Sequence, residues 1–453
     1  MKMKRILALG LGAAIAASAL TGCSTGGSSS TAANSAASQS SAAVSTADSG
    51  SANPTKLTLW TFVEAHANFY KKMAGKWNEA NPTKKVDLTT TVLPYEDMHN
   101  KLTTALQSTG APDLCDIEVT KFSNYLKGTP SLVSLNDALS TYKADVVQSR
   151  LDIYAKDGTY YGVPTHVGAT VMFYNTELLA KAGIDYKTLT TWDKYRAAGK
   201  TFKAKTGKTL GEAETKGAFT LSAIVAQQKG DLTDKSGKPA LTSDAVVKAA
   251  TLMQDMVKDG TMTICTGGYP DNDEAEGWIG AGNVGSVCMP LWYMSRFTNY
   301  MKDNSGKWAI APVPTIQEGQ PRSVGLGGTG TVVTNQCKDQ KLAAEFITWA
   351  KLSDEGEKAI WEDLGFDPVN TKLWSNTSVT KNSSNQFIKY FKTNPFDVLN
   401  EVKSEIQLIK NTEASPAINT QLTTATLNEI FADKKDVKSA LQEAQDAVVN
   451  EVG

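Results

Sequence analysis

Apolar residues recur every three or four positions in two stretches of the chain and predict two amphipathic helices. The first stripe consists of Ala65, Phe69, Met73 and Trp77, and the second of Tyr95, Met98, Leu102 and Leu106. This spacing places the side chains on one helical face, where they can pack on a core. Asn81-Pro82 is expected to end the first helix, and Gly110 the second.

Short runs rich in β-branched and apolar residues flank these helices and predict strands. They cover 57–62 (LTLWTF), 86–93 (VDLTTTVL) and 114–119 (LCDIEV). Alternation of strands with helices of this length indicates a parallel, doubly wound sheet. Ligands of such sheets bind beyond the carboxyl ends of the strands. The residues expected there are Phe62, Glu64 and His66, then Pro94 and Tyr95, then 118–122.

Later β-prone runs are expected to carry the chain between two lobes. The run 165–174 (THVGATVMFY) follows a complete α/β unit, and 307–313 (KWAIAPV) could cross back. Helices are expected to open at Thr191-Trp192-Asp193 and after a Ser243 cap. The segments around 342–349 and from 414 to 449 are also predicted to be helical. No internal repeat is visible.

The amino-terminal segment is built like a lipoprotein signal peptide. Basic residues precede an uncharged apolar stretch, 6–20, that is too short to span a bilayer comfortably. Leu20-Thr21-Gly22-Cys23 then places small residues before a cysteine. We predict removal of residues 1–22, lipidation of Cys23 and a position on the outer face of a membrane. Residues 23–54, nearly all Ser, Ala, Thr and Gly, are predicted to form a flexible tether of about 30 Å. The alternative is an ordinary secretory signal with a chance cysteine.

Length and charge restrict the possible function classes. About 400 of the 453 residues remain after the leader and tether, enough for two lobes with their own cores. Removing Lys2, Lys4 and Arg5 leaves 43 basic residues against 47 acidic ones, a mature charge of −4. This balance argues against nucleic-acid binding, which requires a basic surface.

Four cysteines besides Cys23 are spread along the chain without metal-ligand spacing. They are Cys115, Cys265, Cys288 and Cys337. We expect them to be small buried apolar residues, and a disulfide between any of them is the alternative.

Motifs that would indicate a cofactor, a metal ion or a catalytic nucleophile are absent or misplaced. Residues 325–330 (GLGGTG) fit G-x-G-x-x-G but run into a strand-like segment, so we expect a loop whose backbone approaches a ligand or another lobe. Residues 271–276 (DNDEAE) depart from the calcium-loop pattern and are interpreted as a solvated acidic loop. No cofactor or metal is expected. Carboxylates are numerous enough for a glycosidase pair, so that alternative stays open.

Aromatic and polar residues gather at the expected loops and favour a small polar ligand. The candidate ligand-binding residues are Trp60, Glu64, His66, Tyr95, Glu118, His166, Trp278, Trp292 and Tyr293, with Gly328 in the glycine-rich loop. Sugars offer C–H faces to aromatic rings, and their hydroxyls bind carboxylates, amides or imidazoles. The alternative for each aromatic residue is a place in the core, to which Trp77 and Trp349 are assigned.

The chain resembles the extracellular solute-binding lipoproteins of ABC sugar importers, the maltose-type family, from Leu57 to its end. It is most similar to the arabinose and arabino-oligosaccharide branch of Gram-positive bacteria. The stretches with this resemblance are 116–118 with 122–124, 149–154, 161–170 (YGVPTHVGAT), 289–294 (MPLWYM), 327–333 (GGTGTVV), and 351–353 with 365–368. One departure is 270–273 (PDND), where related proteins often have histidines.

The resemblance implies a periplasmic-binding-protein-like fold, in which two doubly wound α/β lobes are joined by a multi-crossing hinge with sugar in the cleft. Lobe I would comprise 55–165 plus 313–365, and lobe II 166–312 plus 366–453. By position, Trp292 resembles the second-lobe aromatic residue that stacks on sugar, Glu64 and Glu118 resemble first-lobe hydroxyl acceptors, and His166 falls just past the first crossing.

These observations lead to the hypothesis of a lipid-anchored, monomeric receptor, without enzymatic activity, that passes a sugar to the membrane subunits of an ABC permease. The expected ligand is an arabinose-containing mono- or oligosaccharide, with another oligosaccharide as the alternative. Sugar would bind the closed form better and shift the population toward it. We expect Trp292→Ala and Glu118→Gln to weaken binding with little change in melting temperature. The rival functions are a secreted glycosidase and a polysaccharide-binding adhesin.

Overall fold

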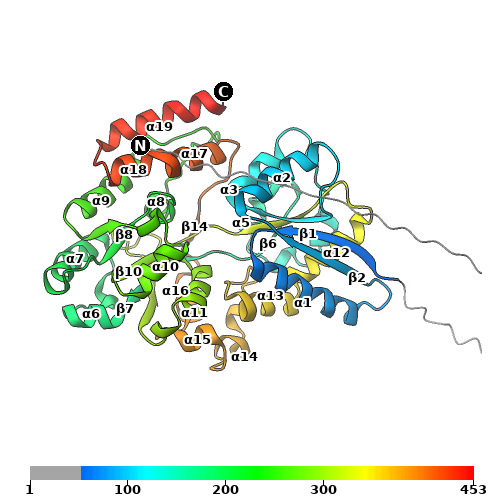
Figure 1. Cartoon of the computed structure of the whole chain (residues 1–453), viewed down its shortest axis with the longest axis horizontal. Coiled ribbons are helices and arrows are strands. Elements are labelled where there is room, and N and C mark those ends of the chain that lie inside the picture. The colour runs from blue at the N-terminus through cyan, green and yellow to red at the C-terminus, as the bar shows by residue number, and fades with distance from the viewer. Residues whose placement is uncertain (1–52, 453) are drawn as a thin grey trace, which may run out of the picture. The chain divides into compact units, whose positions relative to one another are not determined.

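Two β-sheets covered by helices form the folded part of the chain, one in each of two lobes (Figure 1). The computed structural model describes residues 53–452. The predicted signal peptide, Cys23 and the tether as far as residue 52 lie outside the described residues. Both lobes belong to one compact unit.

Short strands and helices alternate along much of the chain. The strands are β1 (Thr55–Thr61), β2 (Val86–Val92), β3 (Leu114–Glu118), β4 (Ala155–Lys156), β5 (Thr159–Tyr160), β6 (Val163–Pro164), β7 (Thr170–Asn175), β8 (Gly211–Ala213), β9 (Met262–Ile264), β10 (Ser286–Pro290), β11 (Trp308–Ala311), β12 (Ser323–Gly325), β13 (Thr329–Val333) and β14 (Ile406–Leu408). The α-helices are α1 (Glu64–Ala80), α2 (Tyr95–Gln107), α3 (Val119–Phe122), α4 (Asn136–Leu139), α5 (Gln148–Asp152), α6 (Thr176–Ala182), α7 (Trp192–Thr206), α8 (Phe219–Gln227), α9 (Asp244–Lys258), α10 (Asp273–Gly280), α11 (Met294–Tyr300), α12 (Gln340–Leu352), α13 (Asp354–Ala359), α14 (Thr377–Thr380), α15 (Gln386–Tyr390), α16 (Pro395–Val402), α17 (Ser415–Gln421), α18 (Leu427–Phe431) and α19 (Val437–Val452).

The first sheet has the strand order β2-β1-β3-β13-β6. β1 pairs in parallel with β2 and β3, and Leu59 lies opposite Leu114. β13 is antiparallel to both β3 and β6. The strands predicted near 57–62, 86–93 and 114–119 and the two helices between them are confirmed, and the first helix ends at Asn81 as expected.

Alternation along β1 separates the two faces of this sheet. Leu57 and Leu59 belong to the main core, which also contains the buried face of α1. Trp60 packs against a smaller cluster together with residues of α2. Trp77 and Trp349, which the sequence assigned to the core, pack edge to face with ring centroids 5.6 Å apart.

The central sheet of the second lobe has the order β10-β7-β11 and is antiparallel throughout. The α/β class is confirmed, but among the described strands the parallel arrangement is confined to β1, β2 and β3 and to the small pairs β8–β9 and β12–β14. The difference has a topological reason. The chain enters the second lobe along β7 and must return toward the first, so β11 runs the opposite way.

The segments that join the lobes run side by side and bond to one another. The amide of Thr165 donates to the carbonyl of Thr329 at 3.1 Å, and the amide of Leu326 donates to the carbonyl of Gly168 at 2.9 Å. The amide of Gly168 donates to the Asp367 carboxylate at 3.1 Å. Gly168 has φ +72°, and a Cβ there would lie 2.3 Å from the Leu326 carbonyl oxygen, so only glycine fits.

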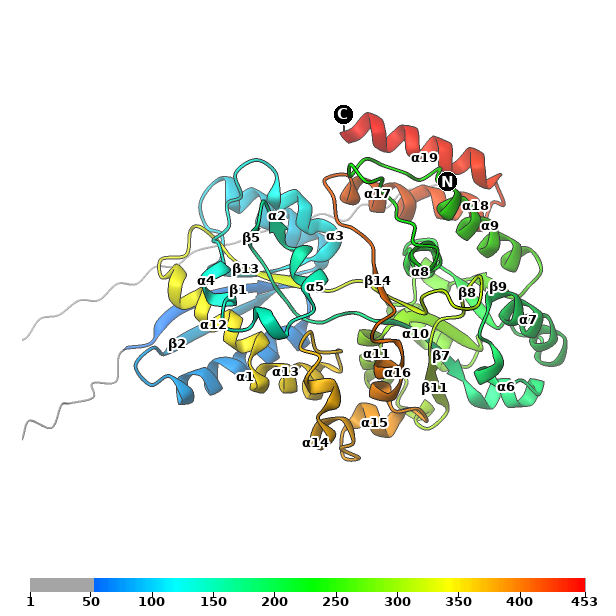
Figure 2. The same cartoon turned by 180° about the vertical axis from the view of Figure 1, so that it is seen from behind.

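The lobe boundaries at 165/166, 312/313 and 365/366 stay predictions. Val313 and Val324 pack in the core cluster of the second lobe, and β12 pairs with β14. The returning chain therefore contacts the second lobe as far as Gly325 and joins the first sheet at Thr329. Figure 2 shows β14 passing between the two lobes.

Two local predictions about helix ends need correction. Ser243 occupies the position before α9 but makes no side-chain capping bond, and its buried hydroxyl has no partner within 53–452. The predicted helical segment 414–449 is interrupted at 432–436, where Lys434 adopts φ +60°. Thr191, by contrast, caps α7, and its hydroxyl oxygen accepts from the Lys194 amide at 3.3 Å.

Candidate ligand-binding site

The carboxylate of Asp116 in β3 accepts hydrogen bonds from several buried groups next to the candidate residue His66. It accepts from the hydroxyls of Thr61 at 2.8 Å, Tyr70 at 2.6 Å and Thr331 at 2.7 Å. His66 Nδ1 lies 3.1 Å from the same carboxylate. Burial raises the pKa of Asp116, but the interactions with His66, Lys351 and Tyr70 together outweigh that effect and hold the pKa below its usual range. Asp116 is therefore an anion that fixes the ring of His66.

Lys351 of α12 places a buried amino group in this network. Its side chain is fully buried, and Nζ donates to the Val163 carbonyl at 2.6 Å and to the Thr331 hydroxyl at 2.7 Å. Burial lowers the pKa of Lys351 to about 7, although the charge of Asp116 opposes that shift. Lys351 thus ties β6 and β13 to the polar centre of the first lobe.

Glu118 sits at the carboxyl end of β3, where the sequence placed a ligand contact. Its carboxylate accepts from the Thr120 amide at 2.8 Å, from the Thr120 hydroxyl, and from the Tyr95 hydroxyl at 3.2 Å. Burial raises its pKa, which these hydrogen bonds partly offset. Nε2 of His99 accepts from the Glu118 amide at 3.1 Å, and burial lowers the pKa of His99 to about 4, so that ring is neutral.

His166 and Gly328 meet where the chain crosses between the lobes. The His166 ring is buried, and neither of its nitrogens has a hydrogen-bond partner within 53–452. Phe366 lies between the two candidate histidines, with ring centroids 4.6 Å from His166 and 5.7 Å from His66. Gly328 has φ +112°, and a Cβ there would be 3.4 Å from His166 Nε2. Burial, followed by the charge of Arg150, lowers the pKa of His166, so a neutral imidazole faces this loop.

Arg150 joins α5 to the glycine-rich crossing. Its guanidinium donates to the Gly325 carbonyl at 3.4 Å and to the Gly327 carbonyl at 2.7 Å. The Gly328 carbonyl in turn accepts from the Val119 amide at 2.9 Å. The backbone of this loop is therefore held against the end of β3, beside Glu118.

Trp292 approaches the same loop from the second lobe. Its ring is 8% exposed, and Nε1 donates to the Leu326 carbonyl at 3.3 Å. Phe219 packs edge to face against it at 5.7 Å and lies nearly parallel to Tyr269 at 5.9 Å. The guanidinium carbon of Arg296 is 5.3 Å from the Trp292 ring centre. An aromatic group with an adjacent cation therefore faces the crossing.

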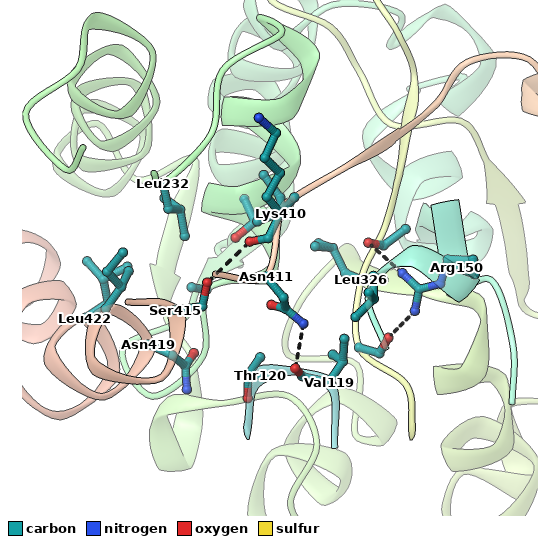
Figure 3. A pocket seen from close by; sticks show the side chains of 17 residues that line it. Val119, Thr120, Arg150, Leu232, Leu326, Lys410, Asn411, Ser415, Asn419 and Leu422 are labelled. Carbon is teal, nitrogen blue, oxygen red and sulfur yellow. Dashed lines mark hydrogen bonds between the residues drawn. The ribbon is translucent and has the colours of Figure 1, made fainter. Parts of the chain in front are cut away.

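A cavity lies between the end of β3 and α17, next to these residues (Figure 3). It encloses about 620 Å³ of empty space, including its open mouth. The lining includes Thr120, which bonds Glu118, and Leu326, which bonds Trp292. Asn411 also lines the cavity and donates from Nδ2 to the Val119 carbonyl at 2.6 Å. Residues of both lobes thus enclose one concave space with polar and apolar walls.

A family model for bacterial extracellular solute-binding proteins matches residues 64–357. The chain belongs to this family. This solute-binding protein is 42% identical over 365 residues to the arabinooligosaccharide-binding protein of Bacillus subtilis, covering 80% of this chain and 84% of the relative. It is 38% identical over 397 residues to the arabinooligosaccharide-binding protein of Halalkalibacterium halodurans, covering 87% and 89%.

Solved structures show the same fold at low sequence identity. The GacH receptor of Streptomyces glaucescens aligns with a TM-score of 0.68 at 21% identity, over 87% of this chain and 97% of that one. An ABC substrate-binding protein from Listeria monocytogenes in complex with cycloalternan aligns with a TM-score of 0.72 at 18% identity, over 88% and 100%. The two-lobe α/β fold expected from the sequence is thereby confirmed.

Four candidate residues of this solute-binding protein lie away from the crossing. Trp60 packs on the α2 side of the first sheet beneath Lys101, whose Nζ is 4.5 Å from the ring centre. Tyr293 is fully buried in the main core. Glu64 is exposed at the start of α1, and Trp278 packs partly buried against the main core. The remaining candidates lie around the crossing between the lobes. They are His66, Tyr95, Glu118, His166, Trp292 and Gly328.

Several residues around the site are absent from the sequence-based candidates. They are Asp116, Arg150, Phe219, Tyr269, Arg296 and Asn411. An acidic residue inside an apolar strand was a usable signal for Asp116, because a buried carboxylate requires partners. Arg150 and Asn411 gave no such signal, since their partners are distant in sequence.

Glu212 and Glu214 form a buried carboxyl pair behind this site. They lie two residues apart at β8, so their side chains share one side of the strand, and both are at most 2% exposed. The Phe219 amide donates to Glu214 Oε2 at 2.6 Å. Burial raises the pKa of Glu212 to about 8, and burial together with the charge of Glu212 raises the pKa of Glu214. The pair therefore retains a proton at neutral pH.

Glu212→Gln is expected to reduce the pH dependence of the free energy of unfolding, which decreases as the pH rises in the wild-type protein. The folded state holds a proton on Glu212 between its ordinary value near pH 4.5 and about pH 8, whereas the unfolded state releases it. Stability is therefore lost as pH rises through this window, by up to about 1.4 kcal/mol per pH unit for one proton. Urea unfolding at several pH values checks this, with the exposed Glu79→Gln as control. Equal slopes in all three proteins would contradict it.

The structure also settles several motif interpretations within residues 53–452. The glycine-rich loop opens a strand, not a helix, as expected. The interpretation of 271–276 as solvated is wrong in part, because Asp271 pairs with Arg296, Asn272 caps α10 and Glu276 is buried. The four cysteines after Cys23 are buried free thiols. No group of three or more His, Cys, Asp and Glu side chains in this part could hold a metal ion.

No helix within 53–452 combines the length and apolar character needed to cross a bilayer.

Proposed function

We propose that this chain is the receptor of an ABC sugar importer and binds an arabinose-containing oligosaccharide. The single observation that carries the proposal is that Glu118, Gly328 and Trp292 meet at the crossing, next to a cavity lined by Thr120 and Leu326, the partners of Glu118 and Trp292. The names of its relatives support the ligand class, since two of them, each similar over at least 80% of this chain, are arabinooligosaccharide-binding proteins.

The proposed contacts follow from the chemistry of a sugar. A pyranose or furanose ring offers an apolar C–H face, which suits the indole of Trp292 and the neighbouring ring of Phe219. Its hydroxyls need acceptors, which Glu118 supplies together with the carbonyl groups of the glycine-rich loop. A buried carboxylate that loses its hydroxyl partner stays unpaired, so this site can discriminate between sugars.

Binding would be coupled to closure of the two lobes. Gly168, Gly327 and Gly328 have positive φ values in the crossing segments, where the backbone must change direction. The Asn411–Val119 hydrogen bond joins the lobes outside these crossings. A sugar that contacts both lobes favours the closed form by its differential affinity. We place the crossings at 165–169, 325–329 and 366–370.

The receptor is proposed to act outside the cytoplasm, as a monomer held to the membrane by lipid on Cys23. The membership in an extracellular family supports this location. Lipidation would keep the receptor close to its permease, and the tether would let it open, close and dock. Metabolic labelling with an alkynyl fatty acid checks this, and Cys23→Ser should abolish the label and release the protein.

A thermal-shift panel tests the ligand. Arabinose, short arabino-oligosaccharides, maltotriose and lactose are added separately to the soluble domain. A ligand at 100 times its Kd stabilises by about 2.7 kcal/mol, which raises the melting temperature visibly. A shift with arabino-oligosaccharides alone supports the proposal, and a shift with another sugar overturns the ligand class. Shorter products after incubation would show a glycosidase instead of a binding protein.

Glu118→Gln is expected to weaken binding of the stabilising sugar about tenfold to hundredfold. A hydrogen bond to a charged group contributes about 1.5–3 kcal/mol, and the amide removes that charge while it keeps the size and one acceptor oxygen. The melting temperature without sugar should change little, because Thr120 and Tyr95 retain an acceptor. Calorimetry measures the affinity. Glu96→Gln is the control, because Glu96 is an exposed residue of α2. Equal affinities would remove Glu118 from the site.

A further inference from the structure

Arg296 lies against the ring of Trp292. The two residues are four positions apart, so the turn from residues 291–293 into α11 places them on one face. The guanidinium carbon of Arg296 is 5.3 Å from the ring centre of Trp292, within cation–π range. A planar guanidinium can lie flat on an indole, which an ammonium cannot.

Asp271 holds the guanidinium from its other side. Nε of Arg296 donates to Oδ1 of Asp271 at 2.5 Å, and Nη2 donates to Oδ2 at 3.0 Å. Nη1 donates to the Ser295 hydroxyl at 2.8 Å, and that hydroxyl donates to the Trp292 carbonyl at 3.0 Å. Three of the five N–H groups are therefore engaged. The two that bind Asp271 form a bidentate pair, which fixes the plane of the guanidinium.

The loop that supplies Asp271 is itself anchored at both neighbours. The Tyr293 hydroxyl donates to the Pro270 carbonyl at 2.9 Å. On the other side, the side chain of Asn272 accepts from the Ala275 amide at 3.0 Å and caps α10. Asp271 is thus a fixed anion, and its side chain is 20% exposed, so water screens the pair little.

Contacts at the ring edge complete the constraint on Trp292. Nε1 donates to the Leu326 carbonyl at 3.3 Å, and a Cβ at Gly327 would lie 3.0 Å from this nitrogen. Arg296 covers one face of the ring. A sugar can therefore stack only on the opposite face, and the direction of that face depends on Arg296.

We propose that Arg296, fixed by Asp271, is a positioning residue that sets the plane of Trp292 for a sugar without touching the sugar itself. This inference rests on the proposed function, because it requires a sugar on Trp292. It also gives the acidic segment after Pro270 a role in ligand binding that is neither solvation nor a cation site.

The experiment observes the ring directly. The nine tryptophans are replaced by 5-fluorotryptophan, and the fluorine resonance of Trp292 is assigned by its loss in Trp292→Phe. Arg296→Met keeps a long unbranched side chain but removes the positive charge and the N–H donors of the guanidinium. Arg196→Met is the matched control, since Arg196 makes a similar pair with Asp259 elsewhere in the second lobe, with Nε 2.5 Å from Oδ2. The affinity for 1,5-α-linked arabinotriose is measured by calorimetry in parallel.

Arg296→Met is expected to shift or split the Trp292 resonance without sugar and to weaken arabinotriose binding about threefold to thirtyfold. Asp271→Asn should act in the same direction with a smaller effect and serves if Arg296→Met does not fold. Arg196→Met should change neither quantity. An unchanged resonance overturns the inference even if affinity falls, because Arg296 would then act directly. A shifted resonance with unchanged affinity also overturns it. Wild-type affinity in Trp292→Phe and Trp292→Ala would instead remove Trp292 from the proposed site.

Discussion

Asp116→Ala is expected to lower the free energy of unfolding by about 3–5 kcal/mol, the cost of breaking a buried ionic network from one side. The carboxylate is fully buried and accepts from Thr61, Tyr70 and Thr331. Its removal leaves these hydroxyls without their acceptor and takes from buried Lys351 the nearby anion that favours its protonated form. Urea unfolding without sugar measures the loss.

The double variant Asp116→Ala/Lys351→Met is the control that isolates the charge. A methionine fills a similar volume without a cation, so the double variant should recover part of the loss caused by Asp116→Ala alone. A double variant no more stable than the single one would show that the hydrogen bonds of Asp116, and not the nearby amino group of Lys351, dominate. A loss below about 1 kcal/mol in Asp116→Ala, within the range of ordinary substitutions, would contradict the buried network.

The first lobe was largely predictable because its signals are local. The stripe from Phe69 to Trp77 and the runs around Leu59 and Leu114 specify helix or strand within a few residues. The order of these elements then implies parallel pairing, which the structure confirms.

The crossing and the second lobe depend on pairs that are distant in sequence. Arg150 and Gly327 are 177 residues apart, and the strands β12 and β14 are separated by β13 and five α-helices. No periodicity records such pairs. The antiparallel direction of β11 likewise follows from the return of the chain to the first lobe, which only the three-dimensional path shows.

Within the site, the resemblance located the position better than composition did. Trp292 and Tyr293 are adjacent aromatic residues, and the sequence treats them alike. In the structure the first contacts Leu326 at the crossing, while the second is fully buried and bonds Pro270. Successive residues of a helical turn point in different directions, so one of two neighbours can face a ligand while the other faces the core.

Trp292→Ala is expected to weaken arabinotriose binding about thirtyfold or more, the effect of a central tryptophan that contributes 2 kcal/mol or more. The sequence-based expectation of little change in melting temperature needs revision, because the ring is only 8% exposed and belongs to the main core. Loss of a buried tryptophan costs about 3–5 kcal/mol, so the apo protein should also melt earlier. Calorimetry is therefore performed well below the melting temperature of the variant.

Trp308→Ala separates the two effects. Trp308 in β11 is fully buried in the same core and packs against Phe297, so its removal should destabilise the protein to a similar extent. It makes no described contact with the crossing at Leu326 or Gly328, so the affinity of the folded fraction should stay near the wild-type value. If both variants lose affinity equally, the loss at Trp292 reflects a damaged core. If only Trp292→Ala loses affinity, the indole is a sugar contact.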